Sequence, residues 1–73
     1  MTKEDLNKYF EIYTDCWRLF RKYSEPSDKD AFWQSLFEEA NALHEKNGKT
    51  EFSEKLILIT EGEINRIFRE RKE

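Results

Sequence analysis

The sequence predicts an all-α fold, a small antiparallel three-helix bundle with helices at about residues 4–23, 28–47 and 51–71. Apolar residues recur at helical spacing in each of these three segments. Two short stretches of turn-forming residues separate the segments. The one strand-like run, at residues 55–60, has no second strand with which to pair. Short connections between the three helices predict an up-down-up arrangement.

The chain has 73 residues, and we expect them to form a single domain over residues 1–73. Cys16 is the only cysteine, so an internal disulfide is excluded. One cysteine and one histidine also fall short of the four ligands of a structural zinc site. Because aromatic residues make up 15% of the sequence, dense aromatic packing and self-association are the stabilising features that remain.

The first segment separates apolar from polar residues most cleanly. Thr2 and Asp5 have the spacing of a capping box at the start of a helix. On a helical wheel the apolar residues of this segment fill one arc of roughly 180°. The arc contains Leu6, Tyr9, Phe10, Ile12, Tyr13, Cys16, Trp17, Leu19, Phe20 and Tyr23. We expect Trp17 and Trp33 to form the aromatic centre of the core, and Leu19 and Tyr23 to lie at its rim.

The second segment has a narrower apolar side. Pro26 disfavours helix at the preceding residue, and Ser27 or Asp28 can cap the helix that follows. The apolar arc spans roughly 140°, and its outer face is net acidic. The arc contains Phe32, Trp33, Leu36, Phe37, Ala40, Leu43 and His44.

The third segment is less regular. Gly48 suits the left-handed position that ends the preceding helix, and Thr50 can cap the next. Its arc of roughly 180° contains Phe52, Leu56, Ile57, Ile59, Ile64, Ile67 and Phe68. Leu58 falls outside the arc and Glu63 falls within it. Gly62 predicts a local irregularity, since glycine in a helix costs about 1 kcal/mol relative to alanine.

Charge and hydropathy argue against nucleic-acid and membrane proteins. Charged residues make up 40% of the chain and the net charge is −3, whereas phosphate binding needs a clustered positive surface. The longest aliphatic run, residues 56–59, is too short to cross a bilayer. Residues 1–10 carry charges where a signal peptide would be apolar. With a free cysteine, these features predict a cytoplasmic protein.

The sequence shows no catalytic, metal-binding or nucleotide-binding motif, so we predict no enzyme, cofactor, metal site or small-molecule substrate. A buried Glu63 would have a raised pKa and could act as an acid or base. At the edge of the arc it would instead pair with Lys55, Arg66 or an aromatic hydroxyl. Cys16 lies among apolar residues, which favours a buried inert thiol over a catalytic pair with His44.

The width of the apolar arcs predicts contact with a second chain. An arc near 180° exceeds what a helix needs in a small three-helix core, and Leu58 adds apolar surface beyond it. The candidate interface residues are Ile12, Leu19, Tyr23, Leu58 and Phe68. We therefore expect a protein that acts by binding a protein partner or itself, as a homodimer or higher oligomer, through docked helix faces.

A basic end of the bundle predicts an alternative function. Up-down-up topology makes the first and third helices parallel, which brings their basic C-terminal ends together. The cations at this end are Arg18, Arg21, Lys22, Arg66, Arg69 and Arg71. They could receive a phosphate backbone, as in a nucleic-acid accessory protein. The favoured interpretation is a solvated face with local ion pairs, such as Asp15 with Arg18.

Overall fold

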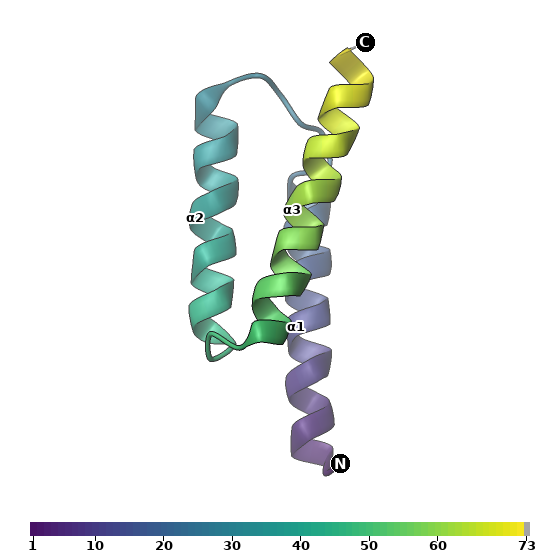
Figure 1. The fold of residues 1–73 in the computed structure, drawn as a ribbon, viewed down its shortest axis with the longest axis vertical. Helices are drawn as coiled ribbons and strands as arrows, with labels where there is room; N and C mark the ends of the chain where they lie inside the picture. Colours follow the sequence, from purple (N-terminus) through teal and green to yellow (C-terminus); the bar gives the residue numbers. More distant parts are fainter. Residues whose placement is uncertain (73) are drawn as a thin grey trace.

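The computed structural model describes residues 1–72, and this part of the chain forms three α-helices joined by two short connections. Helix α1 spans Lys3–Lys22, α2 spans Asp30–Lys46 and α3 spans Glu51–Lys72. Figure 1 shows that α1 and α3 run in the same direction and that α2 runs opposite to them. Each helix packs against the other two, which confirms the predicted antiparallel three-helix bundle.

The bundle is elongated, with principal extents of 46 × 19 × 18 Å. The first turns of α1 extend past the connection between α2 and α3, and the last turn of α3 extends past the opposite connection (Figure 1). Since α1 and α3 are staggered in this way, neither helix is covered along its whole length. The start of α1 therefore has surface that no other helix of the bundle protects.

Three of the helix ends form as predicted. The Thr2 hydroxyl accepts from the Asp5 backbone N–H, and the Asp5 carboxylate accepts from the Thr2 N–H, completing the capping box. Gly48 lies in the turn that follows α2 and has a φ of 80°, in the left-handed region. The Thr50 hydroxyl then accepts from the Ser53 N–H at 3.1 Å, capping the start of α3.

The start of α2 differs from the prediction. Lys29 occupies the N-cap position and makes no side-chain capping hydrogen bond, so the predicted cap at Ser27 or Asp28 is wrong. The Ser27 side chain accepts from the Lys29 N–H instead, and its carbonyl accepts from Trp33 Nε1 at 2.9 Å. Ser27 thereby orders the connection, and α2 begins at Asp30.

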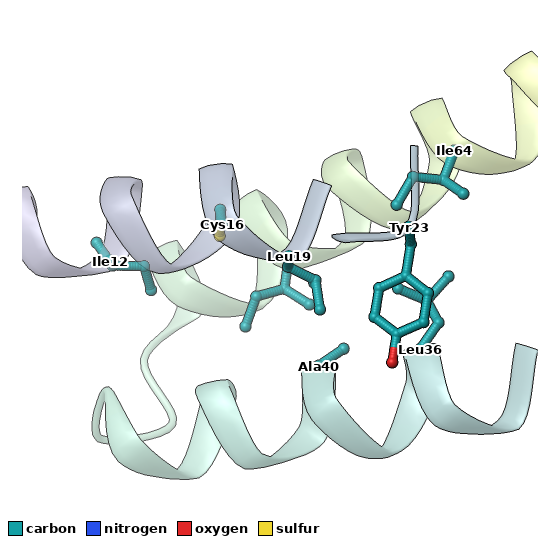
Figure 2. Close-up of a cluster of buried hydrophobic side chains, with 8 residues drawn as sticks. Ile12, Cys16, Leu19, Tyr23, Leu36, Ala40 and Ile64 are labelled. Atoms are coloured by element: carbon teal, nitrogen blue, oxygen red, sulfur yellow. The ribbon is translucent and has the colours of Figure 1, made fainter. Parts of the chain in front are cut away.

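The core is built mainly from one side of α1 packed against α2 and α3 (Figure 2). Its buried residues are Ile12, Cys16, Leu19, Tyr23, Leu36, Ala40, Ile57 and Ile64. At the end of the core, Trp33 packs edge-to-face against Phe32 and Phe68, with ring centroids 4.9 and 5.4 Å apart. Edge-to-face rings are a favoured aromatic geometry, so this cluster supports the open end of the bundle.

The structure reverses the roles predicted for two parts of the α1 arc. Trp17 is 57% exposed, so its predicted place at the centre of the core is wrong. Leu19 and Tyr23 are buried at 4% and 5% exposure, so the prediction that they lie at the rim is also wrong. The wheel gives the width of an apolar arc, but the positions of α2 and α3 decide which part of it is covered.

Helix α3 continues through Gly62, so the irregularity predicted there is absent. A Cβ added at Gly62 would have no heavy atom within 4 Å outside the local helix backbone. We expect Gly62→Ala to raise the free energy of unfolding by about 0.5–1 kcal/mol, because alanine loses less backbone entropy in a helix. Thermal unfolding followed by circular dichroism checks this, and a lower melting temperature than wild type would contradict it.

Candidate interaction surface

Large apolar side chains from α1 and α3 remain exposed on one side of the bundle. We call this surface the α1–α3 apolar face. Each of its seven members is between 37% and 68% exposed. They are Leu6, Tyr9, Phe10, Tyr13 and Trp17 from α1, and Phe52 and Ile59 from α3. Polar outer positions are the rule for helices of a monomeric bundle, so this grouping needs a separate explanation.

The face is continuous across the two helices. Leu6, Phe10, Tyr13 and Trp17 are spaced four, three and four residues apart, which places them along one side of α1. The Phe52 ring meets Tyr13 edge-to-face at a centroid distance of 5.7 Å. It also meets Tyr9, at 5.3 Å. Phe52 therefore joins the α3 part of the face to the α1 part, and Ile59 lies two helical turns further along α3.

The size of the α1–α3 apolar face exceeds what a monomer usually exposes. A fully exposed aromatic side chain presents about 150–250 Å², so the seven side chains at their observed exposures present roughly 800 Å². The largest apolar patch on a typical monomer is about 300–600 Å², and larger patches mark interaction surfaces. This surface is therefore the strongest candidate site on the described part of the chain.

A concavity borders the α1–α3 apolar face where α1 overhangs the bundle. It has a volume of about 760 Å³ and lies between the first turns of α1 and the α2–α3 connection. Its lining includes Tyr9 and Phe52, which belong to the face, together with Ile12, Lys46 and Thr50. A partner that covers the face can thus extend beneath the start of α1.

A smaller apolar area lies on the other side of α3. Phe37 and Leu58 are exposed there, and they line a shallow hollow of about 230 Å³ with His44 and Glu61. Burial raises the pKa of Glu61 above its usual range. Leu58, a predicted interface residue, is thus at the surface, but with fewer apolar neighbours than the residues of the α1–α3 apolar face.

The other predicted interface residues are less available. Ile12, Leu19 and Tyr23 belong to the core and are only 4–5% exposed, so they present very little surface to a partner. Phe68 is half-buried against Trp33. The exposed α1 residues Leu6, Phe10, Tyr13 and Trp17 were not among the predicted interface residues, although their spacing of four, three and four residues is typical of a helix-pairing seam.

The predicted basic end is partly neutralised. Helices α1 and α3 are parallel, so their C-terminal turns point to the same end of the bundle (Figure 1). Three of the six cations form ion pairs, and Arg66 binds two carboxylates at 2.6 and 2.7 Å. The pairs are Lys22 with Glu39, Arg66 with Glu63 and Glu70, and Arg71 with Glu25. Within residues 1–71, Arg18, Arg21 and Arg69 form no ion pair.

Asp15 forms a different ion pair from the predicted one. It is buried, and its Oδ2 accepts from Lys46 Nζ at 3.0 Å, which joins α1 to the last turn of α2. The predicted local pair of Asp15 with Arg18 is therefore wrong. A buried carboxylate with a charged hydrogen-bond partner holds the two helices in register. Arg18 is left exposed to solvent.

The residues considered for acid–base chemistry have structural roles. Glu63 binds Arg66 at the helix surface, and this hydrogen bond lowers the pKa of Glu63, which confirms the edge position. His44 Nδ1 lies 2.9 Å from Ser53 Oγ, and the Ser53 hydroxyl in turn donates to the Thr50 carbonyl. This chain of bonds joins the end of α2 to the start of α3.

Cys16 is buried as predicted, at 5% exposure. Burial raises the pKa of the thiol, and a hydrogen bond with Thr60 acts in the opposite direction. A high pKa and poor access both disfavour the thiolate, which is the reactive form of cysteine. The geometry thus favours a packing role for Cys16 between α1 and α3.

Tyr23 makes the stability of the bundle depend on pH at the alkaline end. Its side chain points toward α2 in Figure 2. Burial is the largest cause that raises the pKa of Tyr23, to about 12, and the hydrogen bond that its hydroxyl donates to Glu39 is the next largest. The unfolded chain releases the Tyr23 proton near pH 10, whereas the folded chain keeps it until about pH 12. The protonated Tyr23 hydroxyl therefore contributes its full stabilisation below pH 10, and this contribution is lost as the pH rises toward 12.

We expect wild type to lose about 2–3 kcal/mol more stability than Tyr23→Phe between about pH 9 and pH 12. Urea unfolding of both proteins at the two pH values measures this difference. The lysines and the exposed tyrosines ionise in both proteins, so their effects cancel in the comparison. Equal losses in the two proteins would contradict the assignment to Tyr23.

The described residues form neither a metal site nor a membrane-spanning helix. No group of three or more His, Cys, Asp or Glu side chains in that part of the chain is arranged to hold a metal ion. No helix there has the length and apolar character needed to cross a membrane.

Comparisons with protein-family models, with curated proteins and with solved structures find no match to this chain. The geometry of the α1–α3 apolar face is therefore the main support for a functional proposal.

Proposed function

We propose that this protein acts by binding a protein, either another chain or a second copy of itself, through the α1–α3 apolar face. The proposal describes a helical binding module with no catalytic role. The observation that carries it is the roughly 800 Å² of continuous apolar surface, which exceeds the usual patch of a monomer. We propose the cytoplasm as its compartment, because its single cysteine leaves no disulfide partner within the chain.

The composition of the face suits a protein partner. Tryptophan and tyrosine are enriched among the residues that contribute most to binding energy, because they bury a large area with few rotatable bonds. Trp17 stands near one end of the α1 part of the face, and Tyr13 is next to it along the seam. A helix of the partner can lie along this row of side chains, as in helix-face docking.

The bundle holds this face rigid. The opposite side of α1 is fixed in the core by residues such as Ile12 and Leu19. The buried pair of Asp15 with Lys46 ties α1 to α2, and Phe52 ties it to α3. A surface presented on rigid elements loses less conformational entropy on binding, so the fold favours the proposed role.

Photo-crosslinking in the cells that express the protein tests this function. A photoreactive phenylalanine analogue replaces Phe10 in the face or, as the control, Glu45 on the outer side of α2. We expect covalent adducts with polypeptide from position 10 and none from position 45. Absence of a polypeptide adduct from position 10, or equal adducts from both positions, would overturn the proposal.

A second candidate function uses the basic end. Its support is the parallel arrangement of α1 and α3, which brings Arg18, Arg21 and Arg69 to the same end without ion pairs in residues 1–71. We propose nucleic-acid binding there as the alternative. Binding to DNA or RNA at low salt should then weaken in Arg21→Gln and Arg69→Gln variants. No binding of wild type at low salt would overturn it.

A further inference from the structure

We propose that the α1–α3 apolar face binds a second copy of this chain, with α1 packed antiparallel against α1 of that copy. This inference rests on the proposed function and names its partner. A two-fold axis perpendicular to α1 would make the contact isologous, with the same patch buried on both chains. Two properties of the face support this occupant: its area and the spacing of its side chains.

The area of the face is what one subunit of a stable dimer requires. Standard protein interfaces bury about 800 Å² on each partner. The seven side chains present roughly 800 Å² on one chain, and a second copy supplies the same area on the other. The two patches would therefore cover each other and leave no large apolar remainder exposed on that side of the bundle.

The spacing of the α1 side chains suits a second helix of the same kind. Leu6, Phe10, Tyr13, Trp17 and Phe20 follow one another at intervals of four, three, four and three residues. This is the spacing of the apolar seam in a coiled coil, where each side chain packs between those of a facing helix. The Trp17 and Phe20 rings stack at a centroid distance of 6.4 Å, which extends the seam toward the end of α1.

Antiparallel packing aligns the two seams closely. With the two-fold axis midway between Phe10 and Tyr13, Phe10 of one chain faces Tyr13 of the second copy. Leu6 then faces Trp17 of that copy, so a small and a large side chain meet at each end of the contact. The overhanging first turns of α1 would lie along the covered end of the other α1 rather than in water.

Sedimentation equilibrium of the wild-type chain tests the identity of the partner. We expect a species of twice 9.0 kDa that dissociates on dilution. A chain that stays monomeric at high concentration would overturn the inference. If position 10 still crosslinks to a different polypeptide in cells, the proposed function stands without self-association. If position 10 gives no polypeptide adduct, the proposed function fails as well.

Disulfide trapping tests the direction of packing. Asn7→Cys and Thr14→Cys variants, each in a Cys16→Ala background, are mixed and oxidised, and the products are identified by mass. Antiparallel packing places position 7 near position 14 of the other chain, so the mixed disulfide should exceed both symmetric products. A predominance of the symmetric products would overturn the antiparallel arrangement. Circular dichroism of each variant establishes that it is folded.

Discussion

A chain carrying Leu36→Ala is expected to lose about 3–4 kcal/mol of stability and to be largely unfolded at 25 °C. Leu36 has no exposed surface and lies on α2 where it meets α1 and α3 (Figure 2). Alanine there removes buried methyl groups and leaves a cavity that the surrounding helices can fill only in part. A domain of this length has only a few kcal/mol of net stability to lose.

Leu58→Ala is the matched control, because it makes the same chemical change at a side chain that is 56% exposed. We expect it to change the free energy of unfolding by less than about 1 kcal/mol. Urea titration followed by helical circular dichroism compares the two variants with wild type. Equal destabilisation by the two substitutions would contradict the position assigned to the core.

The double variant Phe10→Glu/Trp17→Glu is expected to weaken self-association by more than about a hundredfold while keeping its helical content. Both side chains are more than half exposed, so a carboxylate at either position meets water in the free chain. In the proposed dimer the carboxylate at position 10 would be buried against Tyr13 of the second copy and the one at position 17 against Leu6. An unpaired charge is strongly disfavoured in such an apolar contact. Sedimentation gives the dissociation constant, and circular dichroism gives the helical content.

The control for this variant is Phe37→Glu/Leu58→Glu, which places the same charges on the smaller apolar area beside α2 and α3. We expect the control to self-associate like wild type. Equal loss of association in both variants would show that the position of the charge is irrelevant. An unfolded Phe10→Glu/Trp17→Glu chain would place these residues in the core instead of on the surface.

The helices and most of their ends are predictable from the sequence because they depend on near neighbours. The capping box of Thr2 with Asp5 and the left-handed Gly48 involve residues within a few positions of each other. The start of α2 was not predictable, since Ser27 bonds the connection and Trp33 rather than capping the helix as expected. That outcome depends on a contact between the connection and a side chain of the following helix.

The candidate site was harder to predict because the α1 arc contains two seams. Ile12, Cys16, Leu19 and Tyr23 have the same four, three and four spacing as Leu6, Phe10, Tyr13 and Trp17. Either row could face the core when only the wheel is known. The packing of α2 and α3 against α1 settles the choice, and it buries the row that begins at Ile12.

Ion pairs between residues far apart in the sequence could not be predicted from local spacing. Local rules paired Asp15 with Arg18, but Lys46 approaches Asp15 from the end of α2. Likewise Glu39 and Glu25 reach cations at the predicted basic end from outside the helix that carries each cation. These pairs form only when the helices pack. The prediction from the sequence therefore contained more unpaired positive charge at the basic end than the structure has.

The exposure of Trp17 at different protein concentrations tests most directly whether the α1–α3 apolar face is covered by a second copy. In a Trp33→Phe chain, Trp17 is the only tryptophan, and it is 57% exposed in the single chain. Collisional quenching of its fluorescence should be strong in dilute solution and should fall as concentration rises and the dimer forms. Strong quenching at every concentration would contradict the account.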